Sequence, residues 1–245
     1  MASLNTAFHT GDSDDNVLEN RRRIFSLFGY DSHEIVSSIQ VHGTGLAIFS
    51  QVHRGEGALP GSAREQCDAL VTTAEGLTLT AYAADCMLIY FVSQQKALVA
   101  LAHAGWRGTL GGIGSKVVRC LNELYGLAPD RLLVGFSPVV CRNCYRVNGK
   151  VAEQFQSAGW NGPAYLKQIA EENWSLDLAA INAEQLIQTG VKEVNMARSN
   201  WCTSCNPELF YSYRRDQGIT GRMIGFIALK PFGRHNYETE AEKTA

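Results

Sequence analysis

The 245-residue sequence predicts one compact α/β domain whose mixed central sheet is sandwiched by helices. Between residues 69 and 103, short runs are apolar at nearly every position, which is typical of strands covered on both faces. Segments with helical spacing flank this region, and the alternation of strands and helices continues to residue 229. The chain is long enough for one large core. We expect the domain to span residues 1–230 and the polar, charged tail 231–245 to be loosely held.

The first half begins with a predicted helix, because Ser13 and two aspartates form a favourable N-terminus and Gly29 follows the last apolar position. The stretch from 54 to 64, which is rich in glycine and contains Pro60, is expected to be a loop. A helix is predicted over 111–125, where apolar residues share one side. The predicted strands of this half are 35–42, 46–52, 69–72, 77–83, 87–92 and 97–103.

The second half repeats the pattern without an internal repeat or a low-complexity linker. The expected elements are a strand at 132–136, helices at 149–158 and 175–190, and strands at 194–197 and 222–229.

Composition excludes several function classes. A net charge of −2 gives no electrostatic reason to expect nucleic acid or an anionic membrane as a partner. Met1–Asn5 has neither the basic nor the apolar region of a signal peptide, and no apolar run has the length of a membrane span. Seven cysteines without a secretion signal indicate reduced thiols or metal ligands. We expect a cytoplasmic protein that is a monomer or a small homo-oligomer.

Three potential ligands, His42, Cys86 and His103, each stand at the end of an apolar run, and Gly43 and Gly105 closely follow the two histidines. Each alone is more often a half-buried residue with no special role. Together they offer the three ligands of a catalytic zinc, which leaves a position for water and makes that water nucleophilic near neutral pH. Asp85 is a candidate to orient a ligand or to carry a proton. A metal-free Cys86–His103 pair, with the imidazole lowering the thiol pKa, would use the same residues differently.

Three arginines are candidates for anion binding. Arg107 lies in the flexible turn Gly105–Gly108, next to Trp106, which is more often a core residue than a stacking platform. Arg214 and Arg215 follow alternating aromatic residues, although composition alone favours a plain edge strand with solvated arginines.

Two CxxC pairs, Cys141/Cys144 and Cys202/Cys205, are separated by a longer spacer than zinc ribbons use. They are therefore a weak candidate for a second, structural zinc, and packing thiols are the favoured alternative.

Short motifs run in one order along nearly the whole chain, to about Leu229. They are Ser3-Leu4-Asn5, His9-Thr10-Gly11-Asp12, Glu19-Asn20-Arg21, Gln40-Val41-His42-Gly43, Asp68-Ala69-Leu70, Ala84-Asp85-Cys86, His103-Ala104-Gly105-Trp106-Arg107-Gly108, Tyr145-x-Val147, Phe210-x-Ser212-Tyr213-Arg214-Arg215-Asp216 and Thr220-Gly221-Arg222. In this set the chain resembles the YfiH family, also described as the laccase-domain or multicopper polyphenol oxidase family. The motifs around Cys86 and His103, at this separation, are highly specific.

The resemblance implies an α/β/α sandwich related to that of bacterial glutamine-deamidating toxins. It implies zinc bound by His42, Cys86 and His103, with copper a less favoured metal. The implied activities are phosphorolysis of adenosine, inosine and methylthioadenosine, and deamination of adenosine, so that the partners are purine nucleosides and phosphate. We add an inference from chemistry, that substrate is bound by Asn5, Arg107, Arg214 and Arg215.

The sequence also departs from the family pattern. Family members usually carry a Thr-Arg-x-Gly-Gly segment ahead of Ser-Leu-Asn, and Ser137-Pro138 stands where Gly-Pro is common. If that first segment lines the pocket, its loss would weaken or narrow the activity.

Two other functions stay open. A multicopper polyphenol oxidase needs several copper centres, which six histidines, only two of them in the candidate ligand set, do not supply. A metal-free hydrolase or amidase using Cys86 and His103, such as an enzyme that edits cell-wall precursors, needs no metal at all.

Overall fold

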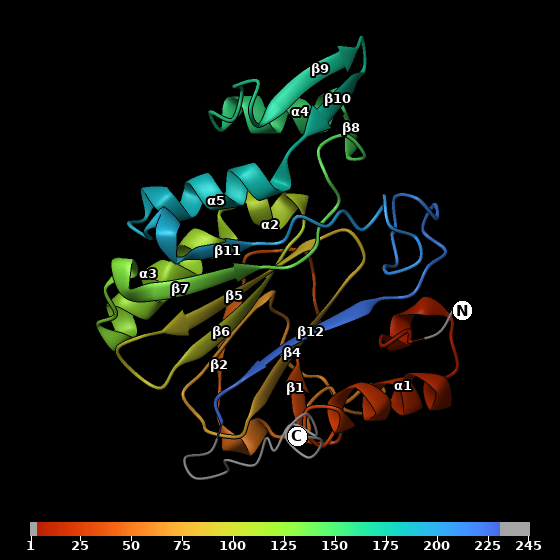
Figure 1. The fold of residues 1–245 in the computed structure, drawn as a ribbon, viewed down its shortest axis with the longest axis vertical. Helices are drawn as coiled ribbons and strands as arrows, with labels where there is room; N and C mark the ends of the chain where they lie inside the picture. Colours follow the sequence, from red (N-terminus) through yellow and green to blue (C-terminus); the bar gives the residue numbers. More distant parts are fainter. Residues whose placement is uncertain (1–3, 231–245) are drawn as a thin grey trace, which may run out of the picture.

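The computed structural model describes residues 4–230, so the tail predicted for 231–245 lies outside the described residues (Figure 1). Its largest element is a six-stranded sheet in the order β11-β7-β5-β6-β3-β2. Antiparallel pairs join the four strands from β7 to β3, whereas the outer pairs β11/β7 and β2/β3 are parallel. The bounds are β2 Leu46–Phe49, β3 Ala69–Thr72, β5 Met87–Ser93, β6 Val99–Ala104, β7 Leu132–Phe136 and β11 Met196–Arg198.

Helices α2 (Trp106–Leu110), α3 (Ile113–Tyr125) and α5 (Leu178–Gln188) lie on one face of this sheet (Figure 1). Between the two layers lies the largest hydrophobic core, in which residues such as Ile89, Val117 and Leu186 are fully buried. Each such side chain contributes about 1.5–3 kcal/mol through its transfer from water. This burial fixes β5 and β6, the two strands from which the candidate site is built.

The opposite face is covered by a second sheet, in the order β1-β4-β12, with bounds Ile35–Ser37, Thr78–Ala83 and Met223–Ala228. Leu79 of β4 packs in one core with Leu70 and Leu101 of the larger sheet. Helix α1 (Asp14–Ser26) covers the outer side of the second sheet, where Phe25 contacts Phe226 with ring centroids 4.9 Å apart. The predicted α/β class with a mixed sheet is confirmed, and the layer between the helices contains two sheets rather than one.

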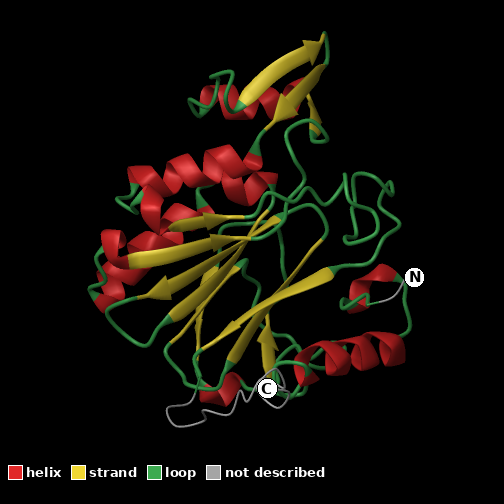
Figure 2. Ribbon diagram, viewed as in Figure 1, coloured by secondary structure: helices red, strands yellow, loops and turns green. Residues whose placement is uncertain are grey.

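A third, small sheet projects at one end of the molecule together with α4 (Gly149–Ser157) (Figure 2). It consists of β8 (Arg146–Asn148), β10 (Asn173–Leu176) and β9 (Leu166–Ala170), all antiparallel. The helix predicted over 175–190 is therefore wrong at its start. The Asp177 side chain accepts a hydrogen bond from the Ala180 amide and begins the helix after the strand has ended.

Other predicted boundaries also shift. The strand predicted over 35–42 ends at Ser37, and the one over 46–52 ends at Phe49 before a 3₁₀ turn. The helix predicted over 111–125 begins at Ile113, because Gly112 has φ +68° and separates it from the short α2. The short 3₁₀ helices are η1 Phe8–Thr10, η2 Gln51–His53, η3 Pro129–Arg131 and η4 Glu193–Asn195.

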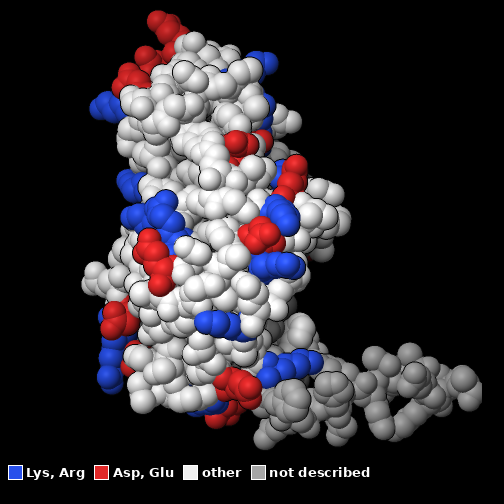
Figure 3. Space-filling view, turned by 90° about the vertical axis from the view of Figure 1, so that its left-hand side faces the viewer, with Lys and Arg blue, Asp and Glu red and all other residues white. Residues whose placement is uncertain are grey.

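Charged side chains of both signs are interspersed over the face drawn in Figure 3, without a broad patch of one sign. This agrees with the small net charge of −2. Within residues 4–230, no helix combines the length and the hydropathy that crossing a bilayer requires.

Candidate active site

His42, Cys86 and His103 come together from three separate segments. Cys86 lies in the turn before β5 and His103 near the end of β6, and the two strands pair so that Leu88 lies opposite His103. Cys86 and His103 are therefore at the same end of one hairpin. His42 arrives from the loop between β1 and β2, in a left-handed conformation with φ 58°, which is costly for a residue with a side chain.

The three candidate ligand atoms all lie within 4.8 Å of one another. The two imidazole rings are 4.8 Å apart and nearly perpendicular, at 84°. His103 is buried, Cys86 is half-buried and His42 is exposed, so the group is reached from solvent on the His42 side. A Cβ atom at Gly105 would lie 3.1 Å from the Cys86 sulfur and 3.2 Å from the His42 ring, which explains the need for glycine there.

Asp68 holds two of these residues in place. Its buried carboxylate lies 2.8 Å from Nδ1 of His103 and accepts the amide N–H groups of Val41, His42 and Gly43, at 3.2, 3.0 and 2.7 Å. The contact with Nδ1 directs Nε2 of His103 toward the cluster, the arrangement that carboxylates give to metal-bound histidines. Burial alone would raise the pKa of Asp68, but the hydrogen bonds from His103 and the backbone outweigh it and lower that pKa.

Cys86 and His103 favour the charged forms of each other. Burial opposes ionisation of the Cys86 thiol, but the His103 charge and hydrogen bonds from both histidines prevail and lower its pKa to about 6. Burial likewise disfavours imidazolium at His103, and the Cys86 charge and the Asp68 hydrogen bond overcome it, raising its pKa to about 9. Without a metal, a thiolate–imidazolium pair is therefore the stable state near neutral pH.

We expect Cys86 of the reduced, metal-stripped protein to react with iodoacetamide as a thiolate, with a rate that rises through a midpoint near pH 6. A thiol with the ordinary pKa of 9.0 would reach the midpoint of its reaction rate about three pH units higher. Quantitative peptide mapping of the Cys86 peptide against pH measures this, since it separates Cys86 from the other thiols. A midpoint near 9 would contradict the ion pair.

Asp85 has a different role from that of Asp68. It is buried, and its two carboxylate oxygens accept the Thr203 hydroxyl and the Arg214 amide, each at 2.5 Å. These bonds hold the turn that carries Cys86, in which Asp85 has a strained φ of 85°. The carboxylate bonded to His103 is that of Asp68, which was not predicted as a site residue although it begins the Asp68-Ala69-Leu70 motif. The proton-carrying role of Asp85 stays a prediction.

A pocket of about 340 Å³ lies near the cluster but is lined by other residues, among them Trp106 and Tyr145. Arg214 stacks on Tyr145, with 5.1 Å from the guanidinium carbon to the ring centroid, and Arg107 lies 4.4 Å from the centroid of Trp106. Burial, followed by the charge of Cys86, raises the pKa of Tyr145, which places Tyr145 within electrostatic range of Cys86. The lining residues are Trp106, Tyr145, Arg146, Val147, Asn148, Val151, Asn173 and Arg214.

Asn5 and Arg215, the other predicted substrate-binding residues, bind protein groups. Asn5 is fully buried, and its amide bonds Thr10, Asp12 and the Arg222 N–H. The guanidinium of Arg215 bonds Asp216 and two backbone carbonyls. Both residues thereby position the loop between β11 and β12. Their contact with substrate stays a prediction.

Two further residues approach the cluster without having been assigned to it. Burial lowers the pKa of Arg222, and the Cys86 charge opposes that shift. The pKa of His9 is lowered by burial and then by the charges of Arg222 and His42. Both residues belong to short motifs of the sequence, His9-Thr10-Gly11-Asp12 and Thr220-Gly221-Arg222, which were the signals available for them.

A second group of potential ligands lies elsewhere among the described residues. Cys141, Cys144, Cys202 and Cys205 bring four sulfur atoms within 4.8 Å of one another and have the chemistry of a metal site. With His42, Cys86 and His103, this gives two clusters of this kind within residues 4–230.

Comparison with known proteins agrees with this picture. "Purine nucleoside phosphorylase YlmD" of Geobacillus stearothermophilus is 37% identical over 229 residues, covering 93% of this chain and 84% of that protein. "Adenosine deaminase RL5", from an unknown prokaryotic organism, is 32% identical and covers 94% and 88%. The crystal structure of YlmD from Geobacillus stearothermophilus superposes with a TM-score of 0.90 at 36% identity, over 94% of this chain and 86% of that one. A family model described as multi-copper polyphenol oxidoreductase laccase matches residues 1–230. The chain therefore belongs to this laccase-domain family.

Proposed function

We propose that the chain is a zinc-dependent purine nucleoside enzyme. It would cleave adenosine, inosine and methylthioadenosine with phosphate, and it would also deaminate adenosine to inosine. The observation that carries the proposal is the convergence of His42, Cys86 and His103. A pocket with two arginines in its wall lies near them, and its Tyr145 is within electrostatic range of Cys86. The names of the similar proteins, a purine nucleoside phosphorylase and an adenosine deaminase, support the same chemistry.

The donor set fits zinc. Two imidazole nitrogens and one thiolate are three of the ligands that tetrahedral zinc accepts, and a catalytic site keeps its fourth position open. The low pKa of Cys86 provides the thiolate, and Asp68 fixes the orientation of His103. A bound zinc would supply Lewis acidity and make a water nucleophilic near neutral pH.

In phosphorolysis, a phosphate oxygen forms a bond to the ribose C1′ while the bond from C1′ to N9 of the purine breaks. The electron pair stays with the purine, which takes up a proton and leaves as the free base. The other product is ribose 1-phosphate, or methylthioribose 1-phosphate from methylthioadenosine. We assign phosphate binding to Arg214 and Arg107, since guanidinium groups hold phosphate oxygens in pairs.

In deamination, water adds to C6 of adenine and ammonia leaves, which yields inosine. The half-buried rings of Trp106 and Tyr145 offer faces for the purine. The Tyr145 hydroxyl stays protonated at neutral pH, because burial raises its pKa, and would donate a hydrogen bond to the base.

The deciding experiment incubates zinc-replete protein with adenosine, with and without phosphate, and separates the products by chromatography. Adenine and ribose 1-phosphate are expected only with phosphate. Inosine is expected in both reactions, with part of it cleaved onward to hypoxanthine when phosphate is present. Loss of both activities on chelation, with recovery when zinc is added back, would support zinc dependence. If no purine nucleoside reacts under either condition, the proposal is wrong.

One observation favours a second candidate, a metal-free cysteine hydrolase or amidase. Cys86, His103 and Asp68 stand in the order nucleophile, base and orienting carboxylate, and the thiol has a pKa of about 6. An enzyme of this kind would keep full amidase activity on a cell-wall precursor after chelation and lose it in Cys86→Ser. Dependence on zinc would exclude it.

A further inference from the structure

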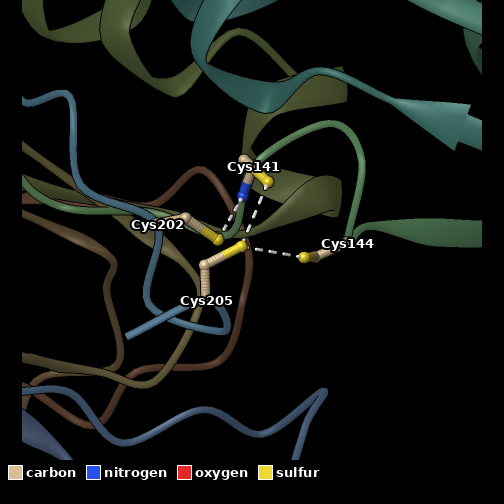
Figure 4. A group of neighbouring side chains, drawn as sticks. All are labelled: Cys141, Cys144, Cys202 and Cys205. Atoms are coloured by element: carbon tan, nitrogen blue, oxygen red, sulfur yellow. Dashed lines mark hydrogen bonds between the residues drawn. The ribbon is translucent and has the colours of Figure 1, made fainter. Parts of the chain in front are cut away.

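The two CxxC pairs meet although Cys144 and Cys205 are 61 positions apart (Figure 4). The first pair follows β7 and the second follows β11, and these two strands are parallel neighbours. Both segments therefore leave the sheet at the same end of its strands. Val139 pairs with Cys202 in an isolated bridge, and the Thr203 amide donates to the Val139 carbonyl, at 3.3 Å. The topology thus supplies the proximity that the sequence spacing concealed.

The four sulfur atoms surround a space that suits one metal ion. Cys205 lies 3.4 Å from Cys144 and 4.0 Å from Cys141, sulfur to sulfur, and all four atoms are within 4.8 Å. Tetrahedral zinc with Zn–S bonds of about 2.3 Å holds its sulfurs about 3.8 Å apart. A disulfide requires about 2.05 Å, well below either of these separations. The geometry is that of a tetrathiolate site.

The backbone around the cluster is folded as sulfur ligands require. The Cys141 N–H donates to the sulfur of Cys202, at 3.2 Å, and so stabilises negative charge on it. The Cys141 carbonyl accepts the amides of both Cys144 and Tyr145, at 2.9 Å each, which closes the first CxxC turn. The side chain of Asn206 donates to the Cys202 carbonyl, at 2.7 Å, and stabilises the second CxxC turn.

We propose that one zinc ion is bound by Cys141, Cys144, Cys202 and Cys205 and cross-links the loops that follow β7 and β11. This site is separate from the cluster of His42, Cys86 and His103. The ion would be structural, because all four ligand positions are taken by protein and none is open to substrate.

The cross-link would position groups of the active site. Thr203 lies within the second CxxC pair, and its hydroxyl donates to Asp85, whose backbone carbonyl accepts the Val140 amide, at 3.1 Å. Tyr145 directly follows the first pair and lies in the pocket wall beneath Arg214. An ion joining the two loops would therefore fix both the turn that carries Cys86 and one wall of the pocket.

Metal content per chain tests the proposal without reference to activity. Protein purified under reducing conditions is analysed by inductively coupled plasma mass spectrometry in four forms: wild type, Cys141→Ser/Cys205→Ser, His42→Ala/Cys86→Ser and Cys120→Ser. The first double variant is expected to lose one equivalent of zinc that the second retains. Cys120, a half-buried cysteine of α3 outside both clusters, is the matched control and should change nothing. Equal zinc in wild type and Cys141→Ser/Cys205→Ser would overturn the proposal.

Spectroscopy keeps the test decisive if that variant fails to fold. Zinc-edge X-ray absorption of His42→Ala/Cys86→Ser is expected to give four sulfur neighbours at about 2.3 Å. Nitrogen or oxygen neighbours would overturn the site. So would a zinc-free protein in which the four cysteines react with an alkylating agent only after reduction, because they would then be disulfide-bonded. Removal of this ion should also lower Tm by roughly 5–15 °C, because it stabilises only the folded chain. The result is independent of the proposed nucleoside activity, which can fail while this site stands.

Discussion

Replacing Cys86 with serine is expected to lower kcat/KM for adenosine phosphorolysis by about a thousandfold or more, with little change in fold. A serine hydroxyl does not ionise near neutral pH, so the variant loses both a zinc ligand and the thiolate that pairs with His103. Product analysis with saturating phosphate measures the loss. Cys120→Ser is the control for cysteine replacement and should keep wild-type activity.

The same variant separates a ligand role from a packing role. Cys86→Ser is expected to keep the circular dichroism spectrum of the wild type, since Cys86 is half-buried and serine is of similar size. Its zinc content should fall by one equivalent while the four-cysteine cluster keeps its own. Activity within threefold of wild type would remove Cys86 from the proposed mechanism.

Asp68→Asn is expected to weaken zinc binding at the active-site cluster by about 10–100-fold, because partners of metal-bound histidines contribute that much to affinity. Asparagine keeps the size of the side chain but loses the charge that supports His103. One amide oxygen also has to serve the three N–H groups of the His42 loop that two carboxylate oxygens share. Competition with a chromophoric chelator measures the affinity.

The matched control is Asp130→Asn, because the Asp130 side chain is 40% exposed and pairs with Lys192 on the surface. Exposed ion pairs contribute little to stability, so this variant should bind zinc as wild type does.

Asp68→Asn should also unfold at lower temperature, since breaking a buried ion pair costs about 3–5 kcal/mol. Unchanged zinc affinity in Asp68→Asn would show that Asp68 only supports the fold.

The residues of the main cluster were accessible to prediction because each ends an apolar run in a distinctive short motif, and glycine closely follows both histidines. Asp68 was not, because nothing local links an aspartate before β3 to a histidine at the end of β6; the 35-residue separation closes only when the strands pair. The proximity of the two CxxC pairs was only weakly predictable for the same reason. The spacer between them contains α4, α5 and the small third sheet, which the spacing of zinc ribbons does not allow for.

The strands of the two sheets could be predicted from runs of residues that are apolar at nearly every position. Such runs are typical of strands covered on both faces, and every residue of β4 and β6 is indeed buried. That pattern gave no means of dividing the strands between two sheets, since strands covered on both faces look alike in either. The third sheet was missed because β9 is exposed at four of its five positions and offers no hydrophobic period to detect.

The pairing of β5 with β6 has a consequence for how this chain tolerates changes in length. Because side chains alternate between the faces of a strand, deletion of one residue within β6 would turn His103 away from Cys86 and toward the opposite face. Residues added in the turn at 94–97, at the far end of the hairpin, leave that alternation intact. Length variation in descendants of this sequence should therefore accumulate in the turn and spare the strands.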